Sequence, residues 1–167
     1  MARAYLSLGS NIGDRARNIA GAIDGLRKRG VGVVRQSSLY ETEPVDFLDQ
    51  DWFLNSVAEI ETELGAEELM RLLLAVERSM GRERRIPKGP RSIDIDVLLY
   101  GDTIVRSPEL KIPHPRMTER RFVLAPLAEI APDVRHPVFQ KTIAELLALT
   151  PDQSEVRRYD SAGGAKQ

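Results

Sequence analysis

The chain has 167 residues, of which 42% are hydrophobic and 29% are charged, a composition that fits one folded domain and excludes a wholly disordered chain. It contains no cysteine, which excludes disulfides, zinc–thiolate sites and cysteine nucleophiles. The 24 Lys and Arg residues nearly cancel the 25 Asp and Glu residues, which argues against a protein that binds nucleic acid through a strongly basic surface.

The first part of the chain alternates between predicted strands and helices. Apolar periodicity and glycine or proline breaks predict, in chain order, a strand at 4–8, a helix ending at 29, strands at 31–40 and 53–63, a helix at 66–80 and a strand at 93–100. Asn11 or Asp14 can cap the first helix. This order predicts an α+β fold with a ferredoxin-like βαββαβ core, in which helices pack on an antiparallel sheet.

The second part of the chain has more turns and prolines. A turn at 101–102 is followed by a short predicted return strand near 103–105. A helix is predicted over 119–130, and another begins at Thr142, where Glu145 stands at capping-box spacing.

Residues 1–150 are expected to form a single domain, and the polar segment 151–167 is expected to be a frayed tail. No apolar stretch approaches the roughly 20 residues needed to cross a bilayer. Residues 1–6 lack the apolar core of a signal peptide. We therefore expect a cytoplasmic protein that does not bind membranes.

Two aspartates share one face of the predicted strand at 93–100. Residues two apart in a strand point the same way, so Asp94 and Asp96 lie side by side with α-carbons about 6.5–7 Å apart. Two carboxylates at this distance repel each other unless positive charge lies between them, and Mg²⁺ prefers such oxygen ligands. A solvated polar sheet face, or neutralisation by arginines alone, would also account for the pair.

Basic residues gather on both sides of these aspartates. Residues 82–91 contain five of them in a segment with Gly89 and Pro90, and a basic loop beside a carboxylate pair suits a complex of polyphosphate and metal. The alternative is a solvated run of charges. A second basic set follows, made up of His114, Arg116, Arg120 and Arg121.

Several short motifs occur in a fixed order along the chain. They are Tyr5-Leu6-Ser7-Leu8-Gly9-Ser10-Asn11, Ser38-Leu39-Tyr40-Glu41-Thr42-Glu43-Pro44, Phe53-Leu54-Asn55, Glu77-Arg78-Ser79-Met80-Gly81-Arg82, Gly89-Pro90-Arg91-Ser92-Ile93-Asp94-Ile95-Asp96 and Pro113-His114-Pro115-Arg116-Met117. In this combination the chain resembles the 6-hydroxymethyl-7,8-dihydropterin pyrophosphokinases of folate biosynthesis. The most specific part of the resemblance is the Gly-Pro-Arg-x-x-Asp-x-Asp run with the downstream Pro-His.

The resemblance implies a reaction in which ATP donates its β,γ-pyrophosphate to the hydroxymethyl group of the dihydropterin and AMP is released. It implies two Mg²⁺ ions held by Asp94 and Asp96. Arg82 and Arg91 would contact the transferring phosphates. These two arginines and Asp96 are the candidate catalytic residues, and the identity of a general base stays open.

The same resemblance assigns the binding residues. ATP would be bound by Glu77, Arg82, Arg91, His114 and Arg120. The pterin would be bound by Thr42, Val45, Phe53, Asn55 and Phe122, with the two phenylalanine rings stacked on either side of it. The implied partners are these two small molecules, with no nucleic acid and no membrane, and the implied state is a monomer.

Two other functions stay open at this point. The aspartate pair would also suit a different two-metal enzyme, such as a nuclease or a phosphatase. A ferredoxin-like fold can also serve as a ligand-binding module without catalysis. Formation of AMP from ATP, Mg²⁺ and the hydroxymethyl-dihydropterin would separate the three.

Overall fold

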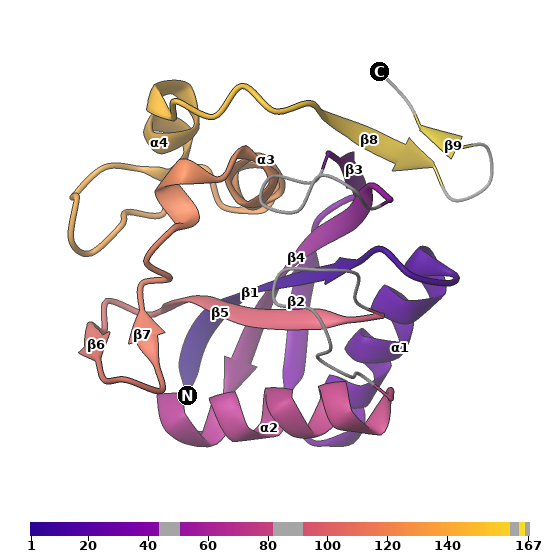
Figure 1. The fold of residues 1–167 in the computed structure, drawn as a ribbon. Helices are drawn as coiled ribbons and strands as arrows, with labels where there is room; N and C mark the ends of the chain where they lie inside the picture. Colours follow the sequence, from indigo (N-terminus) through magenta and orange to yellow (C-terminus); the bar gives the residue numbers. More distant parts are fainter. Residues whose placement is uncertain (44–50, 82–91, 161–163, 166–167) are drawn as a thin grey trace.

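A computed structural model of the chain describes residues 1–43, 51–81, 92–160 and 164–165 (Figure 1). The helices and strands are, in chain order, β1 (Ala2–Ser10), α1 (Arg15–Lys28), β2 (Gly32–Gln36), β3 (Tyr40–Thr42), β4 (Phe53–Thr62), α2 (Ala66–Ser79), β5 (Asp94–Tyr100), β6 (Val105–Arg106), β7 (Lys111–Ile112), the 3₁₀ helix η1 (Met117–Glu119), α3 (Arg121–Ile130), α4 (Ile143–Leu149), β8 (Val156–Asp160) and β9 (Gly164–Ala165).

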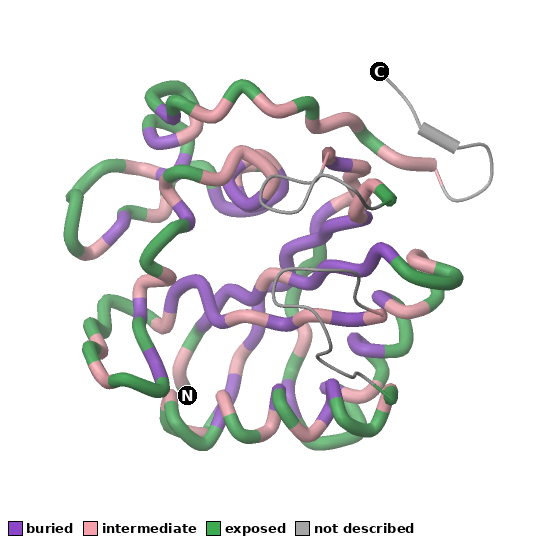
Figure 2. The backbone as a smooth tube through the Cα atoms, in the orientation of Figure 1, coloured by how far each residue is buried: buried purple, intermediate pink, exposed green. Residues whose placement is uncertain are grey.

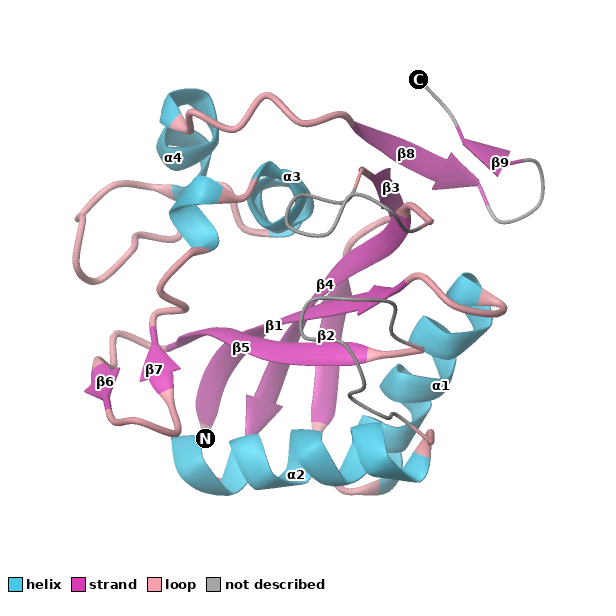
Figure 3. Cartoon of the chain, viewed as in Figure 1, coloured by secondary structure: helices cyan, strands magenta, loops and turns pink. Residues whose placement is uncertain are grey.

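The four central strands lie in the order β5-β1-β4-β2, and their neighbours pair antiparallel. This is the strand order of the ferredoxin-like core, so the predicted α+β fold is confirmed. Beyond the end of β2, the edge of β4 pairs with β3, and β3 in turn pairs with β8. Figure 3 shows the helices on both sides of this sheet.

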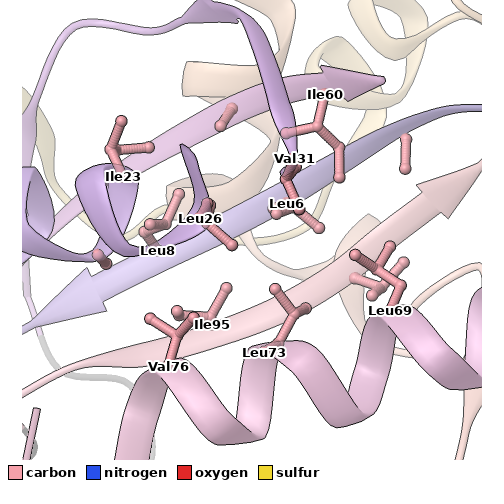
Figure 4. Close-up of a cluster of buried hydrophobic side chains, with 14 of the residues drawn as sticks. Leu6, Leu8, Ile23, Leu26, Val31, Ile60, Leu69, Leu73, Val76 and Ile95 are labelled. Carbon is pink, nitrogen blue, oxygen red and sulfur yellow. The ribbon is translucent and has the colours of Figure 1, made fainter. Parts of the chain in front are cut away.

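Helices α1 and α2 cover one face of the sheet and enclose the larger apolar core (Figure 4). The alternation along β1 places Leu6 and Leu8 on this face, in the same buried cluster as Val76 of α2. Each fully buried side chain of this size contributes about 1.5–3 kcal/mol. The two helices approach closely, because a β-carbon on Gly25 of α1 would lie only 3.3 Å from Cγ1 of Val76.

Helices α3 and α4 cover part of the other face, around a second apolar cluster. The register between β1 and β5 shifts at Tyr5 and Leu6, which pair with Leu99 and Val97. Because of this bulge, Leu98 and Leu99 both reach the second cluster. The opposite end of β5 carries Asp94 and Asp96 and is only half-buried (Figure 2).

The segment after β5 differs from the predicted hairpin. The return strand predicted near 103–105 does not pair with β5, and Val105–Arg106 instead pairs with Lys111–Ile112 in a separate two-stranded sheet. The physical reason is that Leu110 and Ile112 are buried in the apolar core, and Ile112 is the residue that pairs with Val105.

The C-terminal segment also differs from the frayed tail predicted for 151–167. Residues Val156–Asp160 form β8, which pairs with β3, and the backbone N–H of Tyr159 donates to the carbonyl of Leu39 at 2.8 Å. This pairing satisfies an edge of β3 that would otherwise carry unpaired backbone groups. The single-domain organisation over residues 1–150 stays a prediction.

None of the helices in the described parts of the chain combines the length and the apolar character that crossing a membrane requires.

Candidate functional site

Three neighbouring strands bring the predicted pterin and metal residues into one row. Asn55 of β4 pairs with Gly9 of β1, and Gly9 pairs with Asp94 of β5. Directly opposed residues of antiparallel strands point to the same face of a sheet. Asn55 and Asp94 therefore lie on one face, two strand spacings or about 10 Å apart. Two residues further along β5, Asp96 occupies the same face and pairs with Ser7.

Because Gly9 has no β-carbon, it leaves room for the side chain of Asn55 in the middle of this row. A β-carbon at this position would lie 2.7 Å from Oδ1 of Asn55 and 3.6 Å from Cδ2 of Phe53. The first distance is shorter than real β-carbon contacts allow, so a larger residue would displace the amide. The strand predicted from the sequence ended at residue 8, before Gly9, whereas β1 continues to Ser10. A glycine inside a strand often marks a close approach of another group to the backbone.

The predicted pterin residues of β3 and β4 form a buried polar pair. Nδ2 of Asn55 donates a hydrogen bond to Oγ1 of Thr42 at 2.7 Å, and both residues are nearly inaccessible to solvent. This bond orients the amide so that Oδ1, an acceptor, is its atom nearest to Gly9. Phe53 pairs with Thr42 across the two strands and is half-buried.

Phe122 comes to the site from a different layer. It is the second residue of α3, is half-buried, and α3 packs against β4, the strand of Phe53. The guanidinium carbon of Arg120 lies 5.6 Å from the centre of the Phe122 ring. Arg120 therefore stands next to a predicted pterin residue as well as next to the predicted phosphate residues.

A cavity of about 280 Å³ lies between α2, β5 and the segment 109–115. Four predicted residues line it, namely Glu77, Asp94, Asp96 and His114. Apolar side chains line it too, among them Met70, Leu73 and Leu110. The cavity thus combines an apolar surface with acidic groups. Leu73 was not predicted as a site residue, because helical periodicity alone assigns it to the core.

Glu77 has a structural role at this cavity. Its carboxylate Oε2 accepts a hydrogen bond of 2.7 Å from the backbone N–H of Ile95, and the residue is only 3% exposed. Ile95 lies between the two aspartates, so this bond ties α2 to the part of β5 that carries them. Its predicted contact with ATP stays a prediction.

His114 is held as a neutral hydrogen-bond donor. Its Nδ1 accepts the backbone N–H of Arg116 at 3.2 Å. Burial and the nearby Arg120 lower the pKa of His114 to about 4, although Asp94 opposes this shift. The imidazole is therefore neutral at pH 7, and because Nδ1 accepts, its proton lies on Nε2. A phosphate oxygen is a suitable acceptor for that N–H.

The site contains some of the oxygen ligands that a hard divalent cation needs. Asp94 and Asp96 both line the cavity, and carboxylate oxygens are ligands that Mg²⁺ prefers. Within the described ranges, no group of three or more histidine or acidic residues is arranged to hold a metal ion. Phosphate and water oxygens would have to complete the coordination shell.

Three of the predicted site residues lie outside the described part of the chain, namely Val45, Arg82 and Arg91. Their assigned contacts with pterin and phosphate stay predictions.

Residues 5–132 match the model of a family described as 7,8-dihydro-6-hydroxymethylpterin-pyrophosphokinase. The chain is 47% identical over 161 residues to a 2-amino-4-hydroxy-6-hydroxymethyldihydropteridine pyrophosphokinase of Methylorubrum extorquens, covering 96% of this chain and 100% of that protein. It is 44% identical over 164 residues to the folic acid synthesis protein fol1 of Schizosaccharomyces pombe. That match covers 98% of this chain and 22% of the fungal protein, so the chain spans only about a fifth of that relative's length.

A similar fold occurs in a solved structure, wild-type HPPK-DHPS of Plasmodium falciparum with SDX-DHP. The TM-score is 0.68 at 18% sequence identity, and the match covers 89% of this chain and 43% of the other. At this identity the likeness shows the fold alone.

Proposed function

The chain belongs to the 7,8-dihydro-6-hydroxymethylpterin-pyrophosphokinase family, and we propose that it transfers the β,γ-pyrophosphate of ATP to the hydroxymethyl group of 6-hydroxymethyl-7,8-dihydropterin, with release of AMP. The observation that carries this proposal is the row formed by Asn55, Gly9 and Asp94 across three strands. It supports a pterin on the side of Asn55 and a triphosphate on the side of Asp94. The two substrates would then meet above Gly9.

The pterin binds between the rings of Phe53 and Phe122 in this proposal. A flat ring stacked on an aromatic side chain gains on the order of 0.5–1.5 kcal/mol beyond its buried area. Oδ1 of Asn55 accepts an N–H from the edge of the pterin, while Thr42 holds the amide in that orientation. Val45 is proposed to contribute a contact to the same edge.

ATP occupies the cavity lined by α2, β5 and the segment 109–115. Its base fits the apolar surface around Leu73 and Leu110. Nε2 of His114 and the guanidinium of Arg120 donate hydrogen bonds to phosphate oxygens. We propose that Arg82 and Arg91 contact the transferring phosphates.

Asp94 and Asp96 are the residues that would hold Mg²⁺, and the family resemblance implies two ions. When bound, Mg²⁺ supplies neutralisation of the triphosphate charge, which phosphoryl transfer needs more than covalent assistance. A carboxylate bound to metal is a poor base, so we assign Asp96 to binding the ions and leave the general base open. The cytoplasmic location, the monomeric state and the absence of a nucleic-acid partner stay predictions.

The test is to incubate the protein with ATP, Mg²⁺ and hydroxymethyl-dihydropterin and to separate the nucleotides. AMP should form in equal amount to the pyrophosphorylated pterin, and EDTA should abolish it. A dihydropterin with a methyl group in place of the hydroxymethyl group is the matched control, and it should yield no AMP. Formation of ADP, of inorganic phosphate alone, or of AMP without the hydroxyl group would overturn the proposal.

A further inference from the structure

The segment 152–157 lies beyond residues 5–132, which match the family model. It connects α4 to β8 and runs past α3 toward β3 (Figure 1). Its side chains contact the two residues that immediately precede the proposed stacking rings. These residues are Trp52, before Phe53, and Arg121, before Phe122.

Arg157 contacts the ring of Trp52, the residue that precedes Phe53. Its guanidinium carbon lies 4.5 Å from the centre of the indole, a cation–π distance. The same guanidinium is positioned by Glu41, whose Oε1 lies 3.2 Å from Nη2 of Arg157. The side chain of Glu41 is only 15% exposed and that of Arg157 is 32% exposed, so this ion pair is partly shielded from solvent.

A second arginine completes this contact from α1. Nη2 of Arg15 lies 2.8 Å from Oε2 of Glu41, and Nη1 of Arg15 donates to the carbonyl of Trp52 at 2.9 Å. Glu41 therefore joins two guanidiniums, one of which holds the ring of Trp52 while the other holds its backbone. The ring and the backbone of Trp52, the residue before Phe53, are therefore both held in place.

Asp152 contacts Arg121, the residue that precedes Phe122. Its Oδ2 accepts the backbone N–H of Arg121 at 2.8 Å, and Nη1 of Arg121 donates to the carbonyl of Ser154 at 3.1 Å. Arg121 is the first residue of α3, and the N-cap residue Arg120 makes no side-chain capping bond. Asp152 thus supplies the cap from a distant part of the chain.

We propose that residues 152–157 are a brace that sets the gap between Phe53 and Phe122, with Arg157 and Asp152 as its positioning residues. A ring stacked between two others loses contact on one side when the gap widens by a fraction of an ångström. A gap held in advance of binding lowers the ordering cost of the complex and so raises affinity for the pterin. The inference rests on the proposed position of the pterin between the two rings.

The test compares Arg157→Ala and Asp152→Ala with Arg158→Ala. Arg158 is the matched control, because it follows Arg157 in β8 and donates to Oγ of Ser38. We expect the KM for the pterin to rise about threefold to tenfold in both test variants, while KM for ATP stays within twofold. Trp52 is the only tryptophan, so its fluorescence should change in Arg157→Ala and stay unchanged in Arg158→Ala.

Arg157→Lys, which keeps the charge but lacks the planar guanidinium, should give an intermediate KM. If Arg157→Ala does not fold, Glu41→Gln replaces it, because it weakens both guanidinium contacts without removing a side chain. Equal changes in KM for ATP and the pterin would overturn the brace, as would a lower melting temperature with an unchanged KM for the pterin.

Phe53→Ala and Phe122→Ala separate this inference from the proposed function. If both leave the KM for the pterin unchanged, the position of the pterin is wrong, and the brace is wrong with it. If both raise this KM while Arg157→Ala and Asp152→Ala do not, only the brace is wrong.

Discussion

Gly9 and Asn55 are register partners on adjacent strands, and a β-carbon on Gly9 would lie 2.7 Å from the amide oxygen of Asn55. The glycine is therefore what allows a buried amide to occupy the middle of the sheet face. The conflicting atom is the end of a side chain rather than backbone, so a larger residue at this position would move the amide and leave the strand in place.

Gly9→Ala should accordingly raise the KM for the pterin at least about tenfold, the effect of losing one well-placed hydrogen bond or more. The control is Gly32→Ala in β2, where the new β-carbon meets its nearest atom at 3.5 Å, an ordinary contact. Steady-state kinetics with the pterin varied would check this. Equal KM values in the two variants would contradict the role assigned to Gly9.

The aspartate pair should be required for turnover and not for folding. Asp94→Asn and Asp96→Asn should each lower kcat by a factor on the order of 10² or more, since each removes a carboxylate that would hold Mg²⁺ beside the triphosphate. Both residues are half-buried, so the circular dichroism spectrum should be unchanged. Asp102→Asn, at an exposed turn, is the control and should retain full activity. Near-normal turnover in either test variant would remove the metal assignment.

Glu77 should matter for stability as well as for activity. Glu77→Ala leaves the buried N–H of Ile95 without the carboxylate that accepts it, which costs about 1–3 kcal/mol. Glu77→Gln keeps an acceptor oxygen and should lose less. Glu67→Ala, on the exposed side of the same helix, should change the free energy of unfolding by less than about 0.5 kcal/mol. Urea titrations would measure the free energy of unfolding of each variant. At position 77 we expect it to be lowest in Glu77→Ala, intermediate in Glu77→Gln and highest in the wild type.

Glu129 should make the protein less stable in acid. Burial raises the pKa of Glu129, but hydrogen bonds from Tyr40 and Ser38 outweigh burial, and the net pKa lies below 4.5. The unfolded chain therefore binds a proton before the folded one does as the pH falls. Stability from this group is complete above pH 4.5 and is lost as the pH falls through the lowered pKa.

Glu129→Gln should flatten this acid-side decline while lowering stability at pH 7. The free energy of unfolding, measured by urea titration followed through Trp52 fluorescence at several pH values, would check it. Glu67→Gln serves as a control with the same change of charge at an exposed site. An unchanged slope below pH 4.5 in Glu129→Gln would show that the hydrogen bonds of Glu129 do not carry the effect.

Much of the fold could be predicted because its signals are local. Thr142 and Glu145 stand three residues apart and form the capping box of α4, and Asp14 caps α1 as one of two residues predicted to do so. The alternation along β1 and β4 and the apolar stripe of α2 also depend only on near neighbours in the sequence. The order of these elements was enough to predict the ferredoxin-like core.

The return strand and the C-terminal segment could not be predicted in the same way. Val105–Arg106 pairs with Lys111–Ile112, and Ile112 is held in place by burial in the apolar core. Whether Val156–Asp160 is a strand depends on the open edge of β3. The pairing of β8 with β3 joins segments that are far apart in the sequence, and the polar residues of β8 carry little apolar periodicity that would indicate it.

The sequence by itself determined the chemistry of the site. Carboxylates two residues apart on a strand face one way, and the order of the motifs identified the family. Only the tertiary structure decided which residues lie next to these carboxylates, because the register between strands brings together residues that are far apart in the chain. Asn55, Gly9 and Asp94 form one row for that reason. The same packing brings Arg157 and Asp152, from outside the family match, to the two residues that precede Phe53 and Phe122.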